Sequence, residues 1–160
     1  MALTSNQRRA AAAALATAIA IPAEGLRRFA YFDPPGILTV CYGHTGSDVK
    51  AGRPYSLQEC SALLTADMQG ALTAVDRCQP GLPVPILAAF ADAAFNIGPT
   101  VACDVSRSTA ARYLRTGSYS AACQQLSRWD KARVMGVMVT LPGLTKRRAA
   151  ERNLCMTGVV

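Results

Sequence analysis

Residues 24–46, EGLRRFAYFDPPGILTVCYGHTG, carry the strongest structural signals in the chain. Residues 29–33 and 37–43 are rich in aromatic and β-branched side chains, and the Pro-Pro-Gly between them is a strong turn signal. This pattern predicts a β-hairpin. Two carboxylates, Glu24 and Asp33, flank its first strand. Such a pair can protonate a leaving oxygen and act on a water molecule, although this spacing alone also fits unrelated surface charges.

The rest of the chain predicts mainly helices. Ser56 and Glu59 form a capping box that opens a long helix, whose apolar face we expect to be buried. The residues of that face are Cys60, Leu63, Leu64, Met68, Leu72 and Val75. The other predicted helices are residues 5–20 (ending before Pro22), 86–96, 108–114, 119–129 and 145–156. We therefore expect a mostly helical α+β fold, in which the long helix joins a small antiparallel hairpin lobe to a helical lobe.

Length and charge restrict the classes of function. With 160 residues, 51% of them apolar, the chain suits one domain or one domain with two lobes. Its net charge of +7, mostly from arginine, attracts polyanions, and the alternative is a solvated basic surface without such a partner. The basic residues are scattered and no nucleic-acid-binding motif is present, so we expect no nucleic-acid partner. The single histidine and the lack of a Cys-x-x-Cys pair predict no metal site, and we expect no cofactor.

Six cysteines and a distinctive N-terminus point to export. An even cysteine count suits an oxidised, exported protein; six cysteines allow fifteen pairings, and six buried thiols are the alternative. Arg8 and Arg9 precede residues 10–23, an Ala-rich run without charge that has the layout of an export signal. The run is too short and too weakly apolar for a firm transmembrane helix. The alternative is a first helix of the folded protein, because alanine is the best helix former.

The spacing of several motifs resembles a known family. Glu24-Gly25-Leu26, Asp33, Thr39 and residues 43–46 (GHTG) together resemble the catalytic signature of phage-type lysozymes, glycoside hydrolase family 24. The resemblance extends over roughly residues 19–156. Its later segments are Phe95–Gly98, Ser108-Thr109, Arg128-Trp129, Leu141–Leu144, Arg147-Arg148 and Glu151.

The resemblance implies a lysozyme-like fold and a set of residue roles. Glu24 would be the general acid, Asp33 the base or electrostatic partner, and Thr39 a residue that holds a water molecule on the far face of the sugar. That arrangement implies inversion with the two carboxyl groups about 6.5–9.5 Å apart, whereas about 5 Å would imply retention. Asn96 would bind an N-acetyl group, unless it is only a helix C-cap.

Further residues are expected to support the fold. By resemblance, His44 would pair with Asp67. Chain order and the cysteines of exported family members suggest three disulfides, Cys41–Cys60, Cys78–Cys103 and Cys123–Cys155. Arg147, Arg148 and Glu151 are expected to form ion pairs behind the site, and Trp129 is expected to pack in the core.

The resemblance implies an endolysin, a monomer that hydrolyses β-1,4 bonds between N-acetylmuramic acid and N-acetylglucosamine in bacterial peptidoglycan. The alternatives are a lytic transglycosylase acting on the same bond and a non-enzymatic cationic protein that disrupts membrane or wall.

The N-terminal layout resembles that of signal-arrest-release (SAR) endolysins of phages. Residues 1–23 would then be an export signal or anchor-like helix, with residues 10–21 transiently in the inner membrane, and residues 24–160 the catalytic domain. This predicts a protein of the host periplasm that is at first tethered to the inner membrane; the alternative is the host cytoplasm until release.

Overall fold

The structure is a computed structural model that describes residues 2–160. Its helices are α1 (Ser5–Glu24), α2 (Leu57–Cys78), α3 (Val84–Ile97), α4 (Thr100–Cys103), α5 (Thr109–Arg115), α6 (Tyr119–Gln125) and α7 (Pro142–Thr157), with a 3₁₀ turn η1 (Leu126–Arg128). Its strands are β1 (Arg27–Phe32), β2 (Leu38–Cys41), β3 (His44–Thr45), β4 (Lys131–Val134) and β5 (Val137–Thr140). The predicted α+β, mostly helical class is confirmed.

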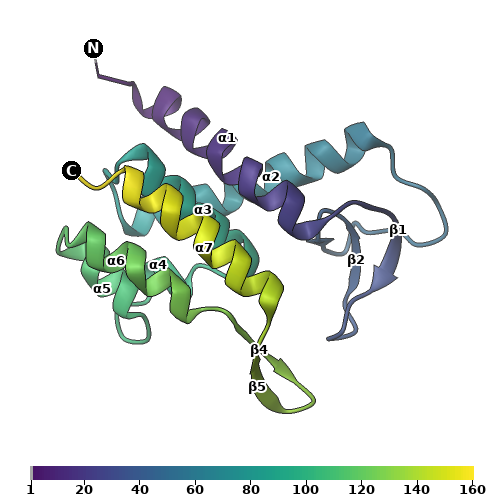
Figure 1. Cartoon of the computed structure of the whole chain (residues 1–160). Helices are drawn as coiled ribbons and strands as arrows, with labels where there is room; N and C mark the ends of the chain where they lie inside the picture. Colours follow the sequence, from purple (N-terminus) through teal and green to yellow (C-terminus); the bar gives the residue numbers. More distant parts are fainter. Residues whose placement is uncertain (1) are drawn as a thin grey trace.

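Helix α3 forms the centre of the helical lobe, where it contacts α1, α2 and α7 (Figure 1). Every residue from Ile86 to Ala94 is buried, and Asp92 is the one charged residue among them. A helix that is apolar on all sides must be surrounded by other elements. Helix α3 therefore fixes the positions of the three helices that pack on it.

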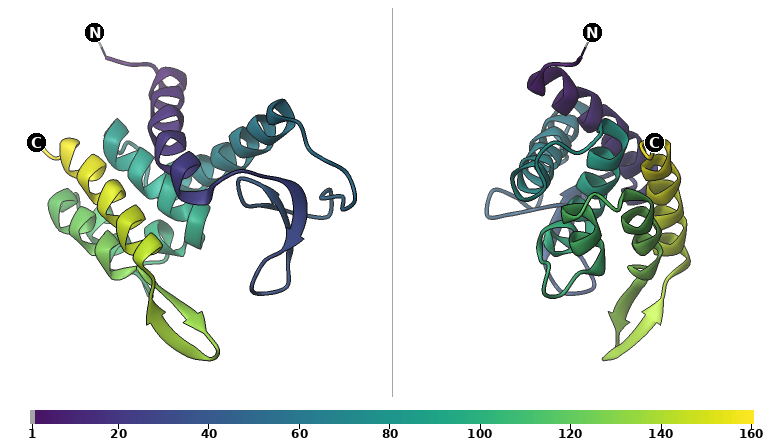
Figure 2. Two further views of the ribbon diagram at one scale, coloured as in Figure 1. Left: turned by 45° about the vertical axis from the view of Figure 1, so that its right-hand side comes forward. Right: turned by 90° about the vertical axis from the view of Figure 1, so that its left-hand side faces the viewer.

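The β lobe is the predicted hairpin with one additional short strand. Strand β1 pairs antiparallel with β2 in a register that puts Tyr31 opposite Thr39, and β2 pairs with β3. A small separate core under this sheet contains Val40, Cys41, Val49, Tyr55 and Cys60. Helix α2 runs from this lobe into the helical lobe (Figure 2). It begins at the predicted capping box, in which the side chains of Ser56 and Glu59 each accept the other's backbone N–H.

Helix α1 is longer than predicted. It was expected to end before Pro22, but it runs to Glu24 with Pro22 in its last turn. A proline there costs a single backbone hydrogen bond, so the turn can still close. Ala12, Ala16 and Ala20 are fully buried in the core formed with α3. Among residues 2–160, none of the helices is both long and apolar enough to cross a membrane.

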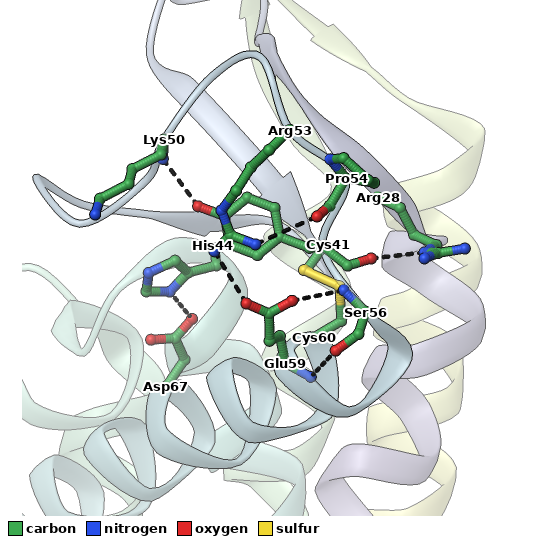
Figure 3. The surroundings of a disulfide bond; sticks show 11 residues. Arg28, Cys41, His44, Lys50, Arg53, Pro54, Ser56, Glu59, Cys60 and Asp67 are labelled. Atoms are coloured by element: carbon green, nitrogen blue, oxygen red, sulfur yellow. Dashed lines mark hydrogen bonds and ion pairs between the residues drawn. A yellow bond between two sulfur atoms is a disulfide. The ribbon is translucent and has the colours of Figure 1, made fainter.

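All six cysteines form disulfide bonds. Cys41–Cys60 joins β2 to the first turn of α2 (Figure 3), Cys78–Cys103 joins the end of α2 to α4, and Cys123–Cys155 joins α6 to α7. Each bond connects elements that pack together in the folded protein. The bonds also close loops in the unfolded chain, and the lower entropy of the unfolded state stabilises the fold.

The segment before α7 differs most from the prediction. The helix expected over residues 119–129 ends at Gln125 and continues only as the 3₁₀ turn η1. Residues 131–140, for which no element was predicted, form the antiparallel hairpin β4–β5. Its turn is Met135-Gly136, where both residues have positive φ (49° and 81°). The short helix α4 was also not predicted, and α7 begins three residues earlier than expected.

Candidate active site

A cavity of about 650 Å³ lies between the two lobes. Its walls come from the end of α1, the β lobe, the middle of α2 and the end of α3. The lining residues are Glu24, Tyr31, Asp33, Thr39, Gly43, Thr45, Ala66, Asp67, Gly70, Ala71, Ala74, Ala94, Phe95, Asn96 and Pro99. The three residues expected to be catalytic are therefore in the wall of one cavity, together with Asn96 and Asp67.

Glu24 is the last residue of α1, and its side chain is held from two sides. Nη1 of Arg147 donates a hydrogen bond of 2.5 Å to one carboxylate oxygen. The other oxygen lies against Gly43, where a Cβ atom would come within 3.0 Å of it. The Glu24 side chain remains 22% exposed and lines the cavity. Glu24 thus has a fixed position with access to a bound molecule.

Asp92 anchors Arg147. Both oxygens of this fully buried carboxylate accept hydrogen bonds from the Arg147 guanidinium, at 2.8 and 3.0 Å. Burial lowers the pKa of Arg147, but the bonds to Asp92 and Glu24 outweigh burial and raise it above the ordinary arginine value. Sequence reasoning missed Asp92. The available signal was an acidic residue within an apolar helix, because a buried charge requires a partner.

Arg148 and Glu151 lie behind Arg147 and are also fully buried. Nη2 of Arg148 donates to Glu151 at 2.6 Å and to Oδ1 of Asn96 at 2.8 Å. Burial raises the pKa of Glu151, and the neighbouring Asp92 carboxylate adds to that effect. Asn96 therefore lines the cavity while its amide oxygen is fixed by a buried arginine, which leaves its NH₂ group to interact with a ligand.

Asp33 and Thr39 line the same cavity from the β lobe. One oxygen of Asp33 accepts the backbone N–H of Ile37 at 2.7 Å, which fixes the carboxylate at the turn. The Thr39 hydroxyl is 3.4 Å from the other oxygen and donates to the Ile37 carbonyl at 3.0 Å. Thr39 is only 3% exposed, so its hydroxyl has a restricted orientation. The Asp33 carboxylate and the Thr39 hydroxyl therefore lie next to each other in the cavity lining.

His44 connects the β lobe to α2. Its Nδ1 is 2.7 Å from Asp67, as Figure 3 shows, and its Nε2 is 3.2 Å from Asp48. Burial acts to lower the pKa of His44, but the bonds to both aspartates outweigh burial and raise it above 6.5. The described residues contain no cluster of three or more His, Cys, Asp or Glu side chains suited to a metal ion. His44 thus helps to hold the lobes together.

Comparison with known proteins gives the family. A family profile described as phage lysozyme matches residues 22–151, which is most of the chain. The chain belongs to the phage lysozyme family. It is a lysozyme-type glycoside hydrolase, and the resemblance found in the sequence is confirmed.

Individual relatives of the chain are phage endolysins. A SAR-endolysin of Bacteriophage PS119 is 37% identical over 139 residues, which cover 84% of this chain and 77% of that protein. A SAR-endolysin of Enterobacteria phage P21 is 33% identical over 136 residues, which cover 84% of this chain and 78% of that protein.

Two solved structures of one endolysin, Lyz of P1 phage, compare differently with this fold. The active form gives a TM-score of 0.78 at 26% identity and covers 91% of this chain and 85% of that chain. The secreted inactive form gives a TM-score of 0.53 at 26% identity, and the match covers 72% of this chain and 78% of that chain. The present fold is therefore nearer to the active form.

Proposed function

We propose that this protein is an endolysin that hydrolyses the β-1,4 bond between N-acetylmuramic acid and N-acetylglucosamine in bacterial peptidoglycan, acting as a monomer. The observation that carries the proposal is the cavity between the lobes, whose lining includes Glu24, Asp33 and Thr39. Two carboxylates on opposite sides of a groove are what the reaction requires. The phage endolysins among the relatives support this choice of substrate.

In the proposed mechanism, Glu24 is the general acid and protonates the leaving oxygen. Arg147 and Gly43 hold its carboxylate in place while the sugar binds. Asp33 and Thr39 hold the attacking water on the far face of the sugar, with Asp33 as the base. A water molecule between the sugar and Asp33 gives inversion of the anomeric configuration. Asn96 hydrogen-bonds an N-acetyl group of the substrate.

Replacing one carboxylate tests this mechanism. Glu24→Gln retains the shape of the side chain but removes its transferable proton, so lysis should fall by at least about a hundredfold. The matched control is Glu59→Gln, because Glu59 lies outside the cavity and glutamine also completes a capping box. Near-parental lysis by folded Glu24→Gln protein would exclude the mechanism.

The products of digestion separate the alternatives. Mass spectrometry of the muropeptides should show reducing ends from hydrolysis. Anhydro ends would indicate a lytic transglycosylase instead. Lysis by the Glu24→Gln variant without any muropeptide release would indicate a membrane-disrupting protein.

The N-terminal helix has a proposed second state. Residues 10–21 would lie in the inner membrane of the host after export, with the chain tethered in the periplasm, and α1 would form in the folded protein only after release. While these residues lie in lipid, Glu24 cannot be held between Arg147 and Gly43, so the tethered form should be inactive. The SAR-endolysin relatives and the greater likeness to the active form of the P1 enzyme support this proposal.

Exposed positions of α1 allow a test that does not disturb packing. Ala10, Ala14 and Ala18 face solvent, whereas Ala12, Ala16 and Ala20 are buried. Replacing the three exposed alanines with leucine adds apolar area without crowding α3, so the variant should stay in the membrane fraction and lyse later. The same three positions changed to serine are the matched control and should shift the protein toward the soluble fractions. A parent protein found wholly in the cytoplasm, or shortened by signal peptidase, would contradict the release proposal.

A further inference from the structure

The hairpin β4–β5 projects away from the helical lobe, beyond the start of α7, in all three views (Figures 1 and 2). The cross-strand pairs Ala132–Val139 and Val134–Val137 alternate with Lys131–Thr140 and Arg133–Met138 along it. Paired residues lie on the same face of a ribbon, and successive pairs lie on opposite faces. One face is therefore entirely apolar, and the other carries both basic side chains.

The apolar residues of this hairpin are exposed to a degree that is unusual for a folded protein. Met135 at the tip is 99% exposed, Val137 63% and Met138 55%. Val134 and Val139 are also exposed. Val134, Val137 and Val139 share the apolar face, whereas Met138 lies on the face that carries Arg133. Exposed apolar side chains gathered on a protruding element indicate a surface that a partner covers.

The exposed basic residues on and near the hairpin favour an anionic partner. From Lys131 to Ala150 the chain has five basic residues and no acidic residue. Three of the five, Lys131, Arg133 and Lys146, are exposed. A protruding apolar tip with basic residues behind it fits an anionic lipid surface, where the tip enters the interface and the cations contact headgroups. Each strand has four residues and a length of about 13 Å, which suffices for an insertion about 5–10 Å deep.

We propose that the β4–β5 hairpin (residues 131–140) binds the surface of an anionic phospholipid bilayer by inserting its tip, Met135 to Met138. Insertion at this site uses the folded protein and leaves α1 packed on α3. The contact is independent of the proposed hydrolysis and of the proposed anchoring by residues 10–21. A protein partner fits less well, because stable protein interfaces use about 20–30 residues a side.

Vesicle co-sedimentation of the full chain tests the proposal. Parent protein should bind vesicles of phosphatidylglycerol and phosphatidylethanolamine, and should bind phosphatidylcholine vesicles more weakly. Met135→Ser/Val137→Ser should lower the partition coefficient on anionic vesicles by about tenfold or more. Ile37→Ser/Leu57→Ser is the matched control, because it also removes two exposed apolar side chains, and it should bind like the parent. Equal binding by the hairpin variant and the parent, or no binding by the parent, would overturn the proposal.

A second measurement reports insertion directly. The chain has one tryptophan, Trp129, which packs partly against the core. A Met135→Trp variant places an indole at the tip, and brominated lipids should quench its fluorescence more strongly than that of the parent. Equal quenching would show that the tip stays in water. If the parent is a dimer in analytical ultracentrifugation and the hairpin variant is a monomer, the surface binds a second copy and the lipid proposal is rejected. If the hairpin variant selectively loses binding to purified peptidoglycan, the lipid proposal is rejected as well.

Discussion

The contact between Gly43 and Glu24 leads to a quantitative prediction for Gly43→Ala. Gly43 has a φ of +79°, a conformation that costs a residue with a Cβ atom about 1–2 kcal/mol. At about 2–4 °C per kcal/mol for a chain of this length, Tm should fall by about 2–8 °C. The new Cβ atom would also come within 3.0 Å of the Glu24 carboxylate. The hydrogen bond from Arg147 restricts how far this carboxylate can move away. A displacement of a few tenths of an ångström should reduce kcat/KM by about tenfold.

The backbone effect can be separated from the effect on Glu24. Gly52 has nearly the same φ, +83°, and an added Cβ atom there would meet nothing within 4 Å. Gly52→Ala should therefore lose a similar amount of stability but retain parental turbidity-clearing activity on peptidoglycan. If the two variants, compared at a temperature where both are folded, have the same kcat/KM, the reasoning about the Glu24 contact is wrong.

Two other predictions concern buried charge and pH. Asp92→Asn leaves Arg147 buried with an incomplete partner and should cost about 3–5 kcal/mol in urea unfolding. Asp76→Asn weakens two more exposed ion pairs, with Arg8 and Arg9, and should cost less, so equal losses would contradict the role given to burial. Burial lowers the pKa of His44, but its two aspartate partners raise it by more, so the folded-state pKa is above the unfolded value. The protonated His44 should therefore stabilise the fold fully below about pH 6.5, and this stabilisation should disappear as pH rises through the higher folded-state pKa. His44→Gln and Asp67→Asn should both flatten the fall of unfolding free energy over that window, and a slope identical to that of the parent would refute the assignment.

Local signals in the sequence were sufficient for much of the fold. The capping box at Ser56 and Glu59 fixed the start of α2, and the Pro-Pro-Gly turn fixed the first hairpin. Pro22 made the predicted α1 too short, because a proline in the last turn of a helix removes one backbone hydrogen bond without ending the helix earlier. The β4–β5 hairpin carried a usable signal, namely β-branched residues on both sides of a two-residue turn that ends in Gly136.

The site was predictable only in part. Motif spacing selected Glu24, Asp33 and Thr39, which lie within sixteen residues of one another in the sequence and line one cavity. The support of Glu24 could not be read from spacing, because Arg147 is 123 residues away and depends on Asp92 in a third helix. Such contacts arise from the packing of α1 and α7 on α3, which no local pattern encodes.

The disulfides also determine how the molecule responds to force. Their loops span residues 41–60, 78–103 and 123–155, so residues 2–40 are outside every covalent loop. A load applied between the two ends of the chain would first meet only noncovalent contacts at its N-terminal side, those of α1 and β1. Single-molecule stretching should therefore straighten this segment to a contour length of about 130 Å, whereas extension of the three loops would be blocked until a disulfide is reduced.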